Sequence, residues 1–90
     1  MDKELFISRV ASLPATTLDD EVVLMSIERG SYYGLKGTAR RIWELLEAPK
    51  TKSELSRLLA DEYEASPDVI AKDLDGFVKK MLEAGIVTLA

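Results

Sequence analysis

The sequence has no cysteine and no histidine, and each absence excludes a class of chemistry. A chain without cysteine forms neither disulfides nor thiolate metal sites. A chain without histidine lacks the commonest general base and the commonest transition-metal ligand. Glycine is present, but its five positions match no phosphate-cradling loop. We therefore expect no metal and no cofactor.

Long apolar runs are also missing. No stretch approaches the roughly 20 apolar residues of a membrane span, and the start, Met1-Asp2-Lys3-Glu4, lacks the basic and apolar regions of a signal peptide. A chain of 90 residues is typical of one small domain. The sequence thus predicts a single domain over residues 1–90 that is cytoplasmic and has no membrane partner.

Basic residues are in the minority, and the formal net charge is −4. Proteins whose function is to contact phosphates are usually basic. The charge balance therefore argues against a nucleic-acid partner, although a local basic patch could override it.

Alternation and turn residues predict three strands in the first part of the chain. Leu5–Val10 alternates loosely and is predicted to form an edge strand, followed by a loop over Ala11–Asp20. Glu21–Glu28 is a β-rich apolar run, and after a tight turn at Arg29-Gly30-Ser31 the chain returns as a strand over Tyr32–Leu35. The last two strands would form a hairpin.

From Thr38 the apolar period becomes that of a helix, which Pro49 would end. A second helix is predicted to open with a capping box, in which Thr51 and Glu54 satisfy each other's backbone donors. The apolar face of the first helix would consist of Ala39, Ile42, Trp43 and Leu46.

The third helix is predicted to begin with Ser66 as its N-cap and Pro67 in its first turn, and to stop at Gly85. The apolar tail Ile86–Leu89 either adds a strand or packs on the core. Three strands followed by three helices predict an α+β fold, a winged helix-turn-helix-like domain with a three-stranded antiparallel sheet. The core stripe of the third helix would be Ile70, Leu74, Phe77, Val78, Met81 and Leu82.

A neighbouring stripe on the third helix comprises Val69, Asp73, Gly76 and Lys80. Gly76 is unusual there, because a glycine in the middle of a helix costs about 1 kcal/mol relative to alanine. Two interpretations stay open. Gly76 either allows close packing against another element of the same domain, or it forms part of a groove wall that a peptide backbone approaches closely.

Catalysis and DNA readout are not predicted. A hydroxyl nucleophile needs an activating base, and the acidic cluster Asp19-Asp20-Glu21 lacks the spacing of a metal-binding loop, so we interpret it as solvated charge. Base readout would need basic or amide side chains at the start of the third helix. That segment instead carries Asp68, Asp73 and Asp75 beside Lys72.

The strand Tyr32–Leu35 is the candidate binding surface. Proteins usually protect exposed sheet edges with charge or proline, whereas this strand offers only Tyr-Tyr-Gly-Leu. An open apolar edge beside a helix suits a peptide that adds as a further strand. Alternation predicts that Tyr33 and Leu35 face the core and that Tyr32 faces outward.

The order and spacing of several segments resemble the PqqD-like family, the recognition elements for precursor peptides that are made on the ribosome and then modified. These segments are "GSYYGL", "ARRIWELL", "TKSEL", "LLADEY" and "DLDGFVKKMLEAGIV", and together they extend from about Val22 to Val87. With no fused enzyme, the chain looks most like the stand-alone leader-binding proteins of lasso-peptide pathways.

The resemblance implies that a leader peptide adds antiparallel to the third strand and lies against the third helix. One departure from the family pattern, Lys36-Gly37 in place of an asparagine, is predicted to leave the groove untouched. Asp73 matches an acid common at this place in the family. The peptide-binding residues implied in this way are Tyr32, Tyr33, Gly34, Leu35, Val69, Asp73, Gly76, Phe77 and Lys80.

The predicted function is therefore non-catalytic. The domain would bind the leader of a precursor peptide and present it to a leader peptidase or another maturation enzyme. The alternative is a winged-helix DNA-binding or regulatory protein. An exposed strand edge also invites pairing with a second copy of the chain, as a homodimer.

Overall fold

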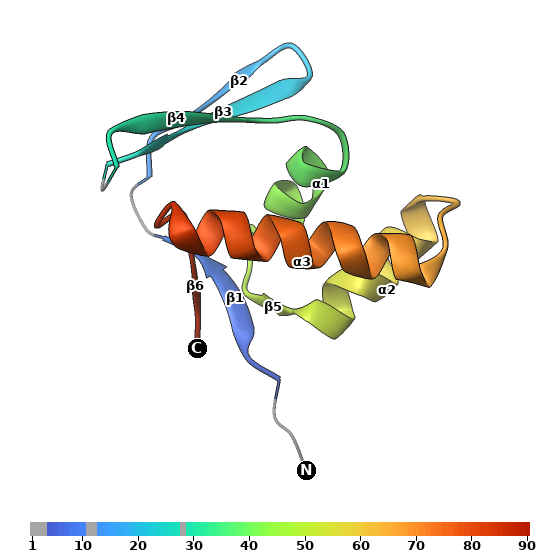
Figure 1. Cartoon of the computed structure of the whole chain (residues 1–90). Coiled ribbons are helices and arrows are strands. Elements are labelled where there is room, and N and C mark those ends of the chain that lie inside the picture. The colour runs from blue at the N-terminus through green and yellow to red at the C-terminus, as the bar shows by residue number, and fades with distance from the viewer. Residues whose placement is uncertain (1–3, 11–12, 28) are drawn as a thin grey trace.

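The computed structural model describes residues 4–10, 13–27 and 29–90 and has an α+β fold in which α3 runs between two small sheets (Figure 1). The C-terminal end of the chain lies on the side of β1 and β6, away from the sheet that contains β4. The elements are β1 (Phe6–Arg9), β2 (Ala15–Leu18), β3 (Glu21–Ser26), β4 (Ser31–Leu35), α1 (Gly37–Leu45), β5 (Lys50–Thr51), α2 (Lys52–Glu62), α3 (Pro67–Glu83) and β6 (Val87–Leu89).

The first sheet contains β5, β1 and β6 in that order, and all its pairings are antiparallel. The prediction of an edge strand at Leu5–Val10 is wrong, because β1 is the central strand. Its two partners, β5 and β6, come from distant parts of the chain and are very short, so no local sequence pattern predicts that they pair with β1. The tail after Gly85 does add a strand, since Thr88 pairs with Ser8.

The second sheet contains β2, β3 and β4, and it replaces the sheet predicted from the first three apolar runs. The loop predicted over Ala11–Asp20 is wrong for its second half, where Ala15–Leu18 pairs with β3. All four β2 side chains are exposed, so this strand has no apolar alternation to reveal it. The hairpin turn falls at Asp19, whose φ of 53° lies in the left-handed region that aspartate tolerates.

The predicted starts of α2 and α3 and the stop of α3 are confirmed by their caps, whereas α1 ends at Leu45, before its predicted end at Pro49. Thr51 accepts a hydrogen bond from the backbone of Glu54, and the Glu54 carboxylate accepts one from Thr51, which completes the capping box. These hydrogen bonds, first the one from the Thr51 backbone, lower the pKa of Glu54. Ser66 caps α3, Pro67 occupies its first turn, and Gly85 follows it with a φ of 72°. No helix within the described residues is long and apolar enough to cross a membrane.

One hydrophobic cluster joins all three helices to both sheets. Leu74 and Met81 of α3 are fully buried, and Leu24 of β3 belongs to the same cluster. The predicted stripe of α3 is confirmed except at Leu82, which is 37% exposed because it lies at the margin of that stripe. The buried members on the helices and at the C-cap of α1 are Ile42, Trp43, Leu46, Leu55, Leu59, Ile70, Leu74, Phe77, Val78 and Met81.

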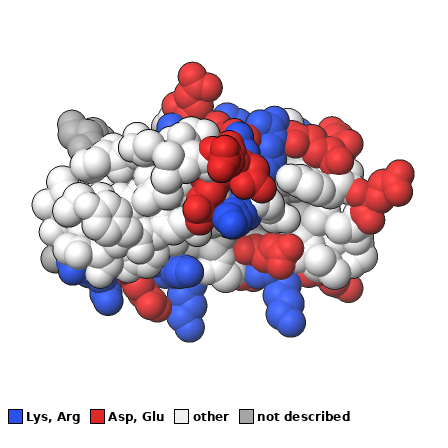
Figure 2. All heavy atoms as spheres, turned by 90° about the horizontal axis from the view of Figure 1, so that it is seen from above, with Lys and Arg blue, Asp and Glu red and all other residues white. Residues whose placement is uncertain are grey.

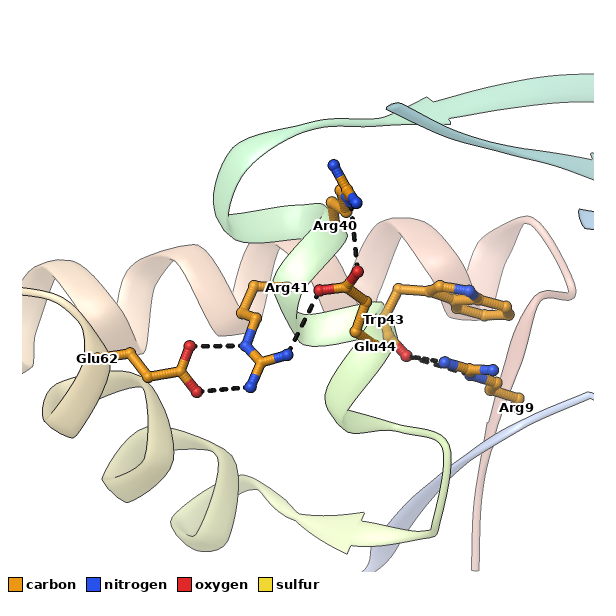
Figure 3. Close-up of polar contacts among 6 residues, drawn as sticks. All are labelled: Arg9, Arg40, Arg41, Trp43, Glu44 and Glu62. Carbon is orange, nitrogen blue, oxygen red and sulfur yellow. Dashed lines mark hydrogen bonds and ion pairs between the residues drawn. The ribbon is translucent and has the colours of Figure 1, made fainter. Parts of the chain in front are cut away.

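Arg9 links β1 to the last turn of α1 through two contacts with Trp43 (Figure 3). Its guanidinium lies 4.1 Å from the centre of the Trp43 ring, and its Nε donates to the Trp43 carbonyl at 3.1 Å. That carbonyl belongs to the last helical turn, and it also accepts a hydrogen bond from the backbone N–H of Leu46 at 3.1 Å. Partial burial lowers the pKa of Arg9, and an arginine side chain is charged at neutral pH. The contact thus combines a cation–π interaction with a helix C-terminal hydrogen bond.

We expect Arg9→Met to lower the free energy of unfolding by about 1–2 kcal/mol, because methionine retains an apolar chain but loses both interactions with Trp43. Urea denaturation followed by tryptophan fluorescence measures the change. Arg57→Met, at an exposed position of α2, is the control. Equal effects of the two substitutions would show that the Arg9 contact contributes nothing specific.

Candidate peptide-binding groove

A groove of about 470 Å³ lies where the end of β4 and the start of α1 face α3. Its walls come from β4, α1 and α3. The first two follow one another in the sequence, and α3, which comes later in the chain, lies beside them in the fold (Figure 1). The lining residues are Gly34, Leu35, Lys36, Thr38, Ala39, Ile42, Lys72, Asp73, Gly76, Phe77, Lys80 and Met81.

The strand β4 is an edge strand, as predicted. It pairs with β3 on one side, and within the described residues no strand pairs with its other side. The two tyrosines divide as alternation predicts. Tyr33 packs against the core and Leu35 is buried, whereas Tyr32 is 70% exposed on the outer face. Every second residue of such an edge presents an unpaired N–H and C=O to whatever lies beside it.

Gly76 opens the α3 side of the groove. A Cβ built on Gly76 would meet no atom within 4 Å. The interpretation that Gly76 allows close packing inside this domain is therefore wrong, because no described part of the domain packs on it. The missing side chain leaves space directly over the helix backbone, between the side chains of Lys72 and Lys80 on the same i, i+4 row.

Two polar contacts tie the hairpin to the end of α3. The buried Ser26 hydroxyl donates to the Ala84 carbonyl at 2.6 Å, and Arg29 Nε donates to the Glu83 carbonyl at 2.9 Å. Both acceptors lie at the C-terminal end of α3, where carbonyls need partners from outside the helix. These contacts fix one end of the hairpin over α3, while α1 supports the strand at the other end.

The start of α1, which lines the groove, is held in place by an ion-pair network with α2 (Figure 3). Arg41 binds Glu62 through two hydrogen bonds of 2.6 and 2.9 Å, and it also reaches Glu44 at 3.4 Å. Arg40 forms a second bond to Glu44. The hydrogen bonds that Arg41 donates lower the pKa of Glu62, and the same donation, first to Glu62 and then to Glu44, raises the pKa of Arg41. The pair orients two helices more than it stabilises them, because it is exposed to solvent.

Six of the nine predicted peptide-binding residues line the groove, namely Gly34, Leu35, Asp73, Gly76, Phe77 and Lys80. Tyr33 lies next to it, with its ring 5.9 Å from the Lys80 ammonium. Tyr32 points away on the outer face of the sheet, and Val69, which is 50% exposed, lies near the start of α3 outside the lining. Only the backbone of Tyr32 belongs to the strand edge.

Sequence reasoning missed the contribution of α1 to the groove. Thr38, Ala39 and Ile42 line it, and so does Lys36, although the sequence predicts that Lys36 leaves it untouched. That prediction is wrong because the chain turns directly from β4 into α1, so the junction faces α3. The change from a strand period to a helix period at this point could have indicated that the junction between β4 and α1 lies beside the groove. Lys72 and Met81 were also missed as lining residues.

The outer face of the hairpin has a different character. Seen from above, one half of the described surface is mostly uncharged, and acidic and basic side chains gather toward the other half (Figure 2). Leu18, Ile27 and Tyr32 are exposed on this sheet or its turn. The groove and the outer face of this sheet therefore lie on different sides of β4.

Residues 21–87 match the family described as coenzyme PQQ synthesis protein D (PqqD). The chain belongs to the PqqD family. No sequence among the curated proteins matches it. The matched residues include β4, α1 and α3, so every wall of the groove lies within the region that matches the family.

Three solved structures share the fold. TbiB1 in complex with the TbiA(beta) leader peptide is 29% identical over 89% of this chain and 93% of its own, with a TM-score of 0.79. Lasso peptide synthetase B1 complexed with a leader peptide is 23% identical over 91% of this chain and 96% of its own, with a TM-score of 0.75. The PqqD truncation of Methylobacterium extorquens PqqCD, a stand-alone recognition element, is 16% identical over 92% of this chain and 88% of its own, with a TM-score of 0.74.

We expect Gly76→Ala to raise the free energy of unfolding by about 1 kcal/mol, because alanine favours the helix and its Cβ would enter open space. For a domain of this size the melting temperature should rise by about 4–8 °C. Differential scanning calorimetry measures it. A fall in stability would mean that another part of the domain does pack on Gly76.

Proposed function

We propose that this PqqD-family protein binds the leader segment of a ribosomally made precursor peptide in lasso-peptide biosynthesis. The observation that carries the proposal is the groove itself. One wall is a strand edge that no strand of the described chain pairs with, and the other is a helix with open space over Gly76. An extended peptide can use the first wall through its backbone and the second through its side chains.

The leader would add to β4 as an antiparallel strand. Because β4 and α3 run in opposite directions (Figure 1), such a peptide would run in the same direction as α3. Its backbone would pair with the outward N–H and C=O groups of β4. Side chains on one of its faces would lie over Phe77 and Met81 at the base of the groove, and those on the other face would reach solvent.

The protein would act without catalysing a reaction itself. By holding the leader, it raises the effective concentration of the attached core peptide near a partner enzyme. We infer that this partner is a leader peptidase or another maturation enzyme, because a recognition domain supplies binding but not cleavage. The DNA-binding alternative has no support from the matched family, and Asp68, Asp73 and Asp75 disfavour it.

Hydrogen exchange tests strand addition directly. On binding a leader, alternate backbone amides of β4 should gain protection of tenfold or more, because they pass from solvent into a ladder. The probes are a synthetic TbiA(beta) leader and the leader of a precursor peptide encoded beside this protein. Amide exchange is followed by NMR.

The edge of β2 with which no strand of the described residues pairs is the internal control for that experiment. It is an edge of the same sheet but lies on the far side of β3 from the groove, so its amides should not change. Equal protection of β2 and β4 would indicate general stabilisation rather than strand addition. Binding of either leader without any protection in β4 would contradict the proposed mode.

Gly76→Leu tests the helix wall. A leucine would fill the space over α3, so leader affinity should fall by at least roughly tenfold while the domain stays folded. Fluorescence anisotropy with the labelled leader measures the affinity. Ala71→Leu adds the same side chain to an exposed position of α3 outside the groove and should bind normally. Undiminished binding by Gly76→Leu would show that the leader does not approach this helix.

A further inference from the structure

The charge of the groove is opposite to that of the whole protein. The chain carries a formal net charge of −4, yet the charged residues lining the groove are Lys36, Lys72 and Lys80 against the single acid Asp73. A cleft lined with one sign of charge concentrates ligands of the other sign.

The lysines of α3 that line the groove are uncommitted within the described part of the chain. Neither Lys72 nor Lys80 takes part in an ion pair there, whereas Lys52 is paired with Asp75 on the opposite margin of the helix. Lys80 has the ring of Tyr33 nearby, at 5.9 Å. Both ammonium groups are therefore available to a ligand without breaking an existing pair.

Their spacing matches an extended peptide. Lys72, Gly76 and Lys80 form one i, i+4 row, so the two lysines stand about 12 Å apart along the helix. Residues four apart on one face of a β-strand are separated by about 13 Å, whereas residues two apart are separated by about 7 Å. A strand lying along α3 therefore brings side chains i and i+4 opposite the two lysines, with residue i+2 opposite Gly76.

From this arrangement we propose that the groove selects peptide segments with acidic residues at positions i and i+4, separated by an uncharged residue that lies over Gly76. The proposal rests on the proposed function, because it assumes that an extended peptide occupies the groove. Lys36, at the start of α1, adds a third positive charge to the groove. Asp73 lies on the adjacent row of α3, and its carboxylate would repel an acidic peptide side chain placed over it. The acidic residues of the peptide should therefore lie over the row of Lys72 and Lys80.

Selection from a displayed library of random twelve-residue peptides tests this proposal without requiring the natural ligand. With the wild-type protein, Asp and Glu should be enriched up to about fivefold at each of two positions four apart, which is the effect of one exposed ion pair. With the double variant Lys72→Glu and Lys80→Glu, Lys and Arg should replace the acids. Lys79→Glu, on the same helix but outside the groove, should select the wild-type pattern.

The outcomes separate this inference from the proposed function. Selected peptides that protect β4 amides but show no acidic pattern overturn the charge inference alone. An acidic pattern that persists in the double variant also overturns it. Absence of any selected peptide that protects β4 overturns the proposed function and, with it, this inference. If circular dichroism shows that the double variant is unfolded, Lys72→Gln and Lys80→Gln serve instead, and loss of acid at the facing position supports the proposal.

Discussion

The burial of one face of α3 is the constraint on which the rest of the structure depends. Leu74 and Met81 lie in the hydrophobic cluster around which both sheets and both other helices pack. A helix that is buried on one side must expose the other, and the rows beside the buried stripe therefore become a surface. The groove occupies that margin, with Phe77 and Met81 at its base and the row from Lys72 to Lys80 at its rim.

The open strand edge and the helix are held at a fixed separation by contacts at both ends. Ser26 and Arg29 bind the last carbonyls of α3, and α1 supports β4 where the chain leaves the sheet. An edge strand that collapsed onto the helix would lose its free hydrogen-bonding groups, and one that swung away would offer only an exposed edge. These contacts therefore keep the strand edge available for binding in a small domain, and small domains are only marginally stable.

Local chemistry was predictable because it depends on neighbours in the sequence. The capping box of Thr51 and Glu54, the N-cap at Ser66 and the inward position of Tyr33 all follow from residues within a few positions of one another. The candidate site was partly predictable for the same reason, since β4 and α3 each carry a periodic signal. The resemblance to the PqqD family then indicated which strand and which helix belong together.

Pairing between distant segments was not predictable from local pattern. The strand β2 has only exposed side chains, and β5 and β6 become strands because β1 passes between them. The sequence by itself determined the helices, the hairpin turn and the uncharged character of β4, because propensity, capping and alternation act over short distances. Only the tertiary structure decided that Gly76 faces open space, that Lys36 joins the groove and that the groove is basic. Those properties depend on which side chains long-range packing brings to the same surface.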